Sequence, residues 1–144
     1  MSTYTQILYQ IVFSTKNREH SLAAIHREEL YRYIWGVLQN QNCHLYRIGA
    51  SIIVTQVHPS VSLAELIKDI KISTLQMIKS ENMFPNFTRW QEGYGAFTYA
   101  YSAKNSLITY VKRQEEHHKK VSFCDEYIRL LKEHGIEFDE KYLF

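Results

Sequence analysis

The spacing of hydrophobic residues along the chain switches between two repeats, and each repeat is typical of one kind of element. Residues 4–15 alternate in places between apolar and polar positions and are rich in Ile, Val, Tyr and Phe, which predicts a strand. Between Ser21 and Asn40 the apolar residues recur every three or four positions, which predicts an amphipathic helix. The stretch HLYRIGASIIVTQVHP predicts two short strands, and Gly49 is expected at the first central position of the type II′ turn between them.

The second half of the chain predicts a similar series of elements. Ser62 and Glu65 have the spacing of a capping box, which predicts the start of a long helix. A polar loop separates this helix from a strand predicted at 96–102, and another helix follows that strand directly. The last helix is predicted at roughly 122–134, with Gly135 just past its end, where glycine is common.

The predicted order is therefore strand, helix, strand, strand, helix, strand, followed by two helices. This order is typical of the ferredoxin-like or split βαβ fold, an α+β arrangement in which an antiparallel sheet carries helices on one face. The two C-terminal helices are additions to that arrangement. No internal repeat, low-complexity segment or linker interrupts the sequence, so we expect residues 1–144 to form a single domain.

Composition and charge narrow the classes of function. No apolar run reaches the roughly 18–20 residues that span a bilayer, and the N-terminus does not have the continuous apolar block of a secretion signal. Cys43 and Cys124 are too few for a disulfide framework or a cysteine zinc site, so we expect a cytoplasmic protein with reduced thiols. The net charge of +2 neither requires nor excludes a nucleic-acid partner. The eleven tyrosines indicate a surface that binds a partner.

The stretch SLITYVKRQEEHHKK, residues 106–120, contains the candidate reactive group. Tyr110 and Gln114 are four residues apart and therefore share one face of the predicted helix. Two adjacent histidines, His117 and His118, follow within the next turn, near the negative end of the helix dipole. Spacing alone favours an exposed polar helix over a reactive site.

Longer stretches of the sequence carry a more specific signal. The segments RWQEGYGAFTYAYS, SVSLAELIKDIK and YVKRQEEHHKKVSFCDEYIRLLKEHGIEFDEKYLF together strongly resemble the small single-tyrosine transposases of the insertion sequence 200/605 type, which belong to the HUH class of nucleases. The resemblance covers nearly the whole chain. It implies an enzyme that cuts and rejoins single-stranded DNA at hairpin ends and that works as a homodimer whose sheets join.

The resemblance also implies roles for individual residues. Tyr110 matches the nucleophile that attacks a DNA phosphodiester and becomes linked to a 5′ phosphate. A free phenol has a pKa near ~10, so it needs help from a divalent cation that withdraws charge from the phosphate. Gln114 matches one ligand of that Mg²⁺ or Mn²⁺ ion. In the family, two histidines that flank one hydrophobic residue on a central strand supply the other ligands.

The chain departs from this family at the histidine pair. The pair is expected within LYRIGASIIVTQVHPSVSL, yet no His-x-His sequence occurs in the 144 residues. Gln56 and His58 have a suitable rhythm but stand several positions too late to be good replacement ligands, and His44 is expected at the surface or edge of the hairpin. Because two of three ligands are missing, we expect weak metal binding and absent or strongly impaired DNA cleavage.

Basic and aromatic residues near the expected site are candidates for DNA contacts. Singly each lysine is typical of a solvated helix, but together they are expected to form one positive face that binds phosphates in a salt-dependent way. Trp90, Tyr94 and Tyr99 are candidates for stacking on bases, with burial in the loop as the alternative for the first two. The basic candidates are Lys16, Arg18, Lys68, Lys71, Arg89, Lys112, Arg113, Lys119 and Lys120.

Three functions remain open at this point. The first is a transposase with impaired catalysis. The second is a non-enzymatic protein that binds hairpin DNA and regulates or competes with active relatives. The third is a dimeric scaffold without a DNA role. Metal-dependent cleavage separates the first from the others, and salt-dependent binding to hairpin DNA separates the second from the third.

Overall fold

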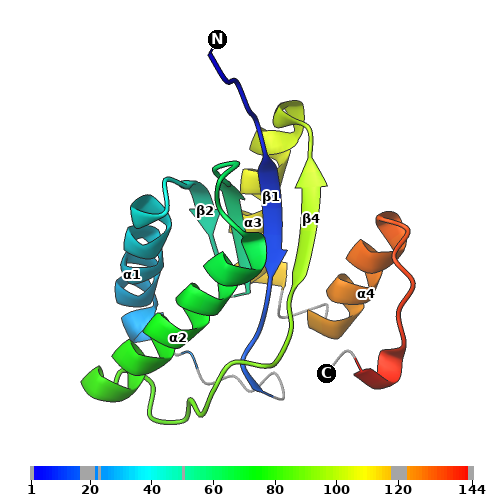
Figure 1. The fold of residues 1–144 in the computed structure, drawn as a ribbon. Helices are drawn as coiled ribbons and strands as arrows, with labels where there is room; N and C mark the ends of the chain where they lie inside the picture. Colours follow the sequence, from blue (N-terminus) through cyan, green and yellow to red (C-terminus); the bar gives the residue numbers. More distant parts are fainter. Residues whose placement is uncertain (1, 17–21, 23, 50, 118–122, 143–144) are drawn as a thin grey trace.

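The sheet has the strand order that the sequence predicts. The computed structural model describes residues 2–16, 22, 24–49, 51–117 and 123–142. Its strands form one antiparallel sheet in the order β2-β3-β1-β4 (Figure 1). Because β3 lies between β1 and β2, this is the split βαβ arrangement, and the predicted ferredoxin-like α+β fold is confirmed. The strands are β1 (Leu8–Val12), β2 (His44–Ile48), β3 (Ile52–Gln56) and β4 (Gly95–Tyr99).

Helices cover both faces of this sheet. Side chains alternate along a strand, so Ile11 of β1 packs into one core with α1 and α2, while Leu8 and Val12 pack into a second core with α3 and α4. The two C-terminal helices therefore occupy the face that the ferredoxin-like arrangement leaves open, and α3 lies behind the sheet in Figure 1. The helices are α1 (Arg27–Asn40), α2 (Leu63–Glu81), α3 (Lys104–His117) and α4 (Phe123–Glu133), with short 3₁₀ turns at Ala24–His26, Tyr101–Ala103 and Glu140–Tyr142.

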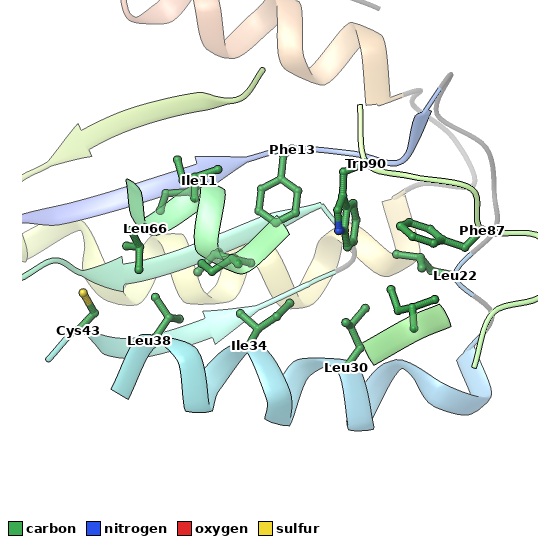
Figure 2. Close-up of a cluster of buried hydrophobic side chains, with 14 of the residues drawn as sticks. Ile11, Phe13, Leu22, Leu30, Ile34, Leu38, Cys43, Leu66, Phe87 and Trp90 are labelled. Atoms are coloured by element: carbon green, nitrogen blue, oxygen red, sulfur yellow. The ribbon is translucent and has the colours of Figure 1, made fainter. Parts of the chain in front are cut away.

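The first core is built around a buried tryptophan from the loop before β4. Figure 2 shows Trp90 among the side chains of β1 and α1. Its ring meets Phe13 edge to face, with 5.1 Å between the ring centroids. Its indole N–H donates a 2.9 Å hydrogen bond to the hydroxyl of Thr74 inside α2. Trp90 is thus an anchor for its loop, the alternative that the sequence left open, and its ring is not available for stacking on bases.

Local signals at the ends of two helices behave as predicted. The hydroxyl of Ser62 accepts a hydrogen bond from the backbone N–H of Glu65 at 3.4 Å, which caps the start of α2. Gly135 follows α4 with a φ of 66°, a left-handed conformation that glycine adopts without steric cost. No helix in the described part of the chain is long and apolar enough to cross a membrane.

The prediction for Gly49 is wrong. Its N–H donates to the carbonyl of Ile52 at 2.8 Å, so Gly49 is the first residue of the turn, before the central positions. In the described residues the glycines with positive φ are Gly93 and Gly135, so Gly49 does not need left-handed backbone. A Cβ atom added at Gly49 would lie 3.0 Å from a methyl carbon of Val111 in α3. A side chain at this position would require Val111 to move, because α3 packs closely against the hairpin.

Candidate tyrosine site and nucleic-acid interface

The side chain of Tyr110 extends from α3 to α4. Its helix packs on the sheet through Leu107 and Val111, which are both buried, so Tyr110 lies at the border of that contact and is half-buried. Its hydroxyl donates a 3.1 Å hydrogen bond to Oε2 of Glu126 in α4. A guanidinium nitrogen of Arg129, also in α4, donates to the same hydroxyl at 3.0 Å. The phenol therefore has an acceptor for its proton and a cationic donor to its oxygen.

Gln114 belongs to the same network. The prediction that Tyr110 and Gln114 share one helix face is confirmed, because the amide nitrogen of Gln114 donates to the Glu126 oxygen that Tyr110 also contacts. Gln114 is only 3% exposed, and Glu126 is 8% exposed. A buried carboxylate thus receives two hydrogen bonds from α3, and these bonds offset part of the cost of removing its charge from water.

Glu126 and Arg129 were not predicted as site residues, although one signal for Glu126 was readable in the sequence. Glu126 stands one helical turn before Leu130, and both belong to the stripe of residues by which α4 is buried. A charged residue within an apolar stripe usually has a buried partner. Arg129 gave no comparable signal in the sequence, because an arginine on a helix surface is common. In the structure its side chain is half-exposed.

The environment of Tyr110 keeps the phenol protonated. Burial and the adjacent carboxylate of Glu126 raise its pKa from 10 to about 12, and they outweigh Arg129, which acts in the opposite direction. A nucleophilic tyrosine reacts through the oxygen that has lost, or is losing, its proton. The network therefore favours the protonated phenol over the phenolate.

Three of the predicted basic residues meet at a hollow on the other face of the sheet. The hollow has a volume of about 410 Å³ and lies between α2 and the loop at 89–94, where Lys68, Lys71 and Arg89 line it together with Tyr94. Tyr94 is 41% exposed, which leaves its ring accessible. Lys16 lies close by, since its backbone N–H donates to the carbonyl of Arg89 at 2.9 Å.

Lys71 differs from the other basic residues of this hollow. Its ammonium donates to the carbonyls of Gln91 and Gly93 at 3.0 and 2.6 Å, so it anchors the loop. Burial lowers the pKa of Lys71, against a weaker opposite effect of Glu92.

Two further basic candidates do not join this hollow. Lys112 and Arg113 are exposed on α3, where Arg113 and Tyr110 line a separate hollow of about 480 Å³. Because α2 and α3 cover opposite faces of the sheet, the candidates within the described residues form two groups and not the expected single positive face. Arg18, Lys119 and Lys120 lie outside the described residues. Tyr99, the third stacking candidate, is partly buried and donates to the side-chain oxygen of Gln10 at 2.7 Å.

Comparison with known proteins decides the family. The family described as "Transposase IS200 like" matches residues 3–114. The chain belongs to the IS200-like transposase family. No curated protein matches its sequence significantly.

Two solved structures share the IS200-like fold at a TM-score of 0.59 and 14% sequence identity. One is a crystal structure of a protein assigned as a transposase from Deinococcus radiodurans R1, for which the match covers 79% of this chain and 95% of that chain. The other is a REP-associated tyrosine transposase bound to a REP hairpin, for which the match covers 84% of this chain and 76% of that chain. At this identity the similarity shows the fold alone.

The residues of this IS200-like chain do not fit the metal ion that the family resemblance implies. The sheet face covered by α3 presents Ile52 and Val54 from β3, both buried and apolar, and neither can coordinate an ion. Gln114 could offer only its amide oxygen as a ligand, since its amide nitrogen donates to Glu126. Within the described residues, no group of three or more histidine, cysteine or acidic side chains is placed to hold a metal. A hard divalent cation would find too few ligands here.

The replacement ligands considered from the sequence do not supply the missing pair. β3 ends at Gln56, whose side-chain oxygen accepts from the hydroxyl of Tyr46 at 3.2 Å. His58 lies beyond the strand, is exposed, and contacts the hydroxyl of Ser60 at 2.6 Å. His44 is exposed at the start of β2, as predicted. His117 is the last residue of α3, and His118 lies outside the described residues.

Proposed function

We propose that this IS200-like family member binds single-stranded DNA that forms hairpins, and that its cutting and rejoining of DNA through Tyr110 is strongly impaired. One observation carries the second half of the proposal. The hydroxyl of Tyr110 donates a hydrogen bond to the buried carboxylate of Glu126, and its helix, α3, faces apolar side chains where the family has metal-binding histidines.

The chemistry of strand cleavage explains why this arrangement impairs it. The phenol oxygen would form a bond to phosphorus, the bond from phosphorus to the 3′ oxygen would break, and that oxygen would take up a proton. Charge accumulates on the phosphate during the transfer and has to be neutralised. Among the described residues, the guanidinium of Arg129 is the cation that contacts Tyr110, and it also pairs with Glu133 at 2.8 Å. A raised phenol pKa and a cation shared with Glu133 both predict a slow reaction.

DNA binding is supported by a different part of the molecule. The hollow between α2 and the 89–94 loop combines the cations of Lys68 and Arg89 with the exposed ring of Tyr94. Cations beside an accessible aromatic ring suit DNA with unpaired bases, because phosphates and base faces are recognised together. The structural neighbour bound to a REP hairpin is consistent with this class of ligand.

A binding and cleavage experiment tests both halves. The probe is a pool of hairpin oligonucleotides with single-stranded flanks, labelled at the 3′ end so that a 5′-phosphotyrosine adduct retains the label. We expect the logarithm of the binding constant to fall linearly with the logarithm of the salt concentration. We expect no labelled covalent adduct on a denaturing gel with Mg²⁺ or Mn²⁺. An adduct that Tyr110→Phe abolishes would contradict impaired cleavage, and absence of binding at low salt would contradict the DNA role.

If binding without cleavage is observed, the protein acts as a hairpin-DNA-binding regulator derived from a transposase. Homodimer formation, which the family resemblance implies, and a cytoplasmic location, expected from the two reduced cysteines, stay predictions. Light scattering across a concentration series checks the oligomeric state of the free and DNA-bound protein.

A further inference from the structure

A groove lies beside the edge strand β2, away from Tyr110 and away from the hollow on α2. It has a volume of about 600 Å³ and is formed by the start and middle of α1 together with the whole of β2. Trp35 of α1 lines it and is 48% exposed, which is unusual for the largest apolar side chain. Arg27 and Arg47 also line it and supply cations from either side.

A second copy of this chain is a poor occupant of the groove. An edge strand has unpaired backbone groups that can pair with another strand, but β2 is irregular, with a shift of register between Leu45 and Arg47. Such bulges and exposed charged residues hinder pairing between edges. The strand sequence HLYRI has no acidic residue, so self-pairing along β2 would bring no carboxylate from that strand to Arg47.

The groove has the chemistry that single-stranded nucleic acid requires. Proteins that bind single strands combine cations for the phosphates with aromatic faces for the bases. Trp35 offers such a face, and Arg27 and Arg47 line the same groove, although Nε of Arg27 already donates to the carbonyl of Leu22 at 2.7 Å. The carboxylate in the groove, Glu28, lies 3.9 Å from Arg32 in an exposed pair, so its charge is partly balanced.

The cationic and aromatic surface continues from the groove towards the tyrosine helix. Tyr46 of β2 lines the groove, and the ammonium of Lys104 lies over its ring at 5.2 Å from the centroid. The same ammonium lies 4.5 Å from the centroid of Tyr101, which is exposed. Lys104 is the first residue of α3, and the hollow that contains Tyr110 begins at the next residue, Asn105.

We infer that a single-stranded DNA segment crosses the edge of the sheet at β2, with a base stacked on Trp35 and phosphates bound by Arg47 and Lys104. This inference rests on the proposed DNA function and assigns a path to the unpaired part of the ligand. The path leads from α1 around the sheet edge to the hollow beside Tyr110.

The test separates single-stranded from duplex contacts. The probes are fluorescein-labelled oligo(dT) of 20 nucleotides and a blunt hairpin without flanks. Trp35→Ala and Arg47→Ala should each weaken oligo(dT) binding by about tenfold. Both should change affinity for the blunt hairpin less than about twofold. Trp35→Phe keeps an aromatic face and should recover most of the oligo(dT) affinity.

A matched control comes from the same helix. Tyr33→Ala removes an exposed aromatic ring of α1, and Tyr33 does not line the groove. It should leave oligo(dT) affinity unchanged, and thermal unfolding should show that all variants are folded. In a complementary measurement, oligo(dU) carrying 5-bromodeoxyuridine should crosslink to Trp35, mapped by mass spectrometry.

The outcomes distinguish this inference from the proposed function. If Trp35→Ala binds oligo(dT) as tightly as Tyr33→Ala does, the path across β2 is wrong although the protein still binds DNA. If Trp35→Ala instead converts a dimer to a monomer with oligo(dT) affinity unchanged, the groove is an interface between copies and the inference fails. If the wild-type protein binds neither probe at low salt, the proposed function fails with it.

Discussion

Tyr110 contacts a carboxylate and a guanidinium at the same time, and its properties follow from their balance. Glu126 accepts a hydrogen bond from its hydroxyl at 3.1 Å, and Arg129 donates a hydrogen bond to its oxygen at 3.0 Å. Burial raises the pKa of the phenol most, the Glu126 carboxylate raises it further, and Arg129 lowers it by less. At the scale of single residues, the candidate nucleophile is therefore stabilised as a neutral phenol.

Replacing Glu126 tests this balance. In Glu126→Gln the negative charge is removed while the shape of the side chain is kept. The pKa of Tyr110 should fall from about 12 but stay above 10, because burial is the larger cause and remains. The measurement is NMR of tyrosines labelled at Cζ, with Tyr110→Phe to assign the signal. A Tyr110 pKa that does not move in Glu126→Gln would show that the carboxylate has no influence on it.

The same pKa links stability to pH in the alkaline range. Folded Tyr110 keeps its proton up to about pH 12, whereas an unfolded tyrosine loses it near 10. The stabilisation from this group is fully present below pH 10 and is lost as the pH rises towards 12. The free energy of unfolding, measured with urea from pH 9 to 11.5, should fall less steeply for Tyr110→Phe than for the wild type. Tyr4→Phe, at an exposed position, should follow the wild-type curve. Identical slopes for all three proteins would refute the link.

A second residue-scale prediction concerns the buried indole of Trp90. Its N–H donates to the hydroxyl of Thr74, which is itself fully buried. Thr74→Val keeps the volume but leaves the N–H without an acceptor, which should cost about 1–3 kcal/mol in the free energy of unfolding. Ser80→Ala, on the exposed part of the same helix, should change it by less than about 0.5 kcal/mol. Chemical denaturation measures both, and equal stability of the two variants would disprove the role of this hydrogen bond.

At the scale of elements, the contact between α3 and the β2–β3 hairpin decides where Tyr110 lies. Gly49 allows α3 to approach because a Cβ atom there would be 3.0 Å from Val111. Val111 is one residue after Tyr110 and is buried against the sheet. A change in the hairpin is therefore transmitted to the tyrosine through the position of its helix.

Gly49→Ala tests this contact. We expect a loss of about 1–3 kcal/mol in the free energy of unfolding, because the new methyl group overpacks against Val111. In a Val111→Ala background the same substitution should cost less, since the clashing methyl group is gone. Urea denaturation of the four proteins in this double-mutant cycle gives the coupling. Strictly additive effects would show that Gly49 and Val111 do not constrain each other.

At the scale of the whole molecule, the sheet separates two groups of basic residues. α2 carries Lys68 and Lys71 on one face, and α3 carries Lys112 and Arg113 on the other. A ligand that contacts both groups has to pass around an edge of the sheet. The groove at β2 offers such a route. The net charge of the chain is only +2, so binding of the proposed polyanionic ligand depends on where the basic residues lie and not on their total charge.

Two lysines of α2 should respond differently to the same substitution. Lys68 is exposed at the hollow, so Lys68→Met should leave stability unchanged. It should reduce the magnitude of the slope of the logarithm of the DNA-binding constant against the logarithm of the salt concentration by about one. Lys71→Met should lower the free energy of unfolding by about 1–2 kcal/mol, because its ammonium anchors the 91–93 loop. Lys79→Met, exposed on the same helix, is the control for both measurements. The assignment fails if Lys68→Met and Lys79→Met have the same salt dependence.

The sequence by itself determined the type and order of the elements and the pairing of two site residues. Periodicity and capping act between neighbours within about four positions, so the strands, the Ser62 cap and the shared face of Tyr110 and Gln114 could be predicted locally. The missing histidine pair was also visible, because the order of residues is enough to show that no His-x-His exists.

Only the tertiary structure decided what those residues meet. Glu126 is 16 positions from Tyr110, and its carboxylate reaches the phenol because α3 and α4 pack on the same face of the sheet. The role of Gly49 and the separation of the basic residues likewise depend on which faces pack together. Such contacts are fixed by the close packing of side chains distant in sequence, and no pattern within a single element encodes them.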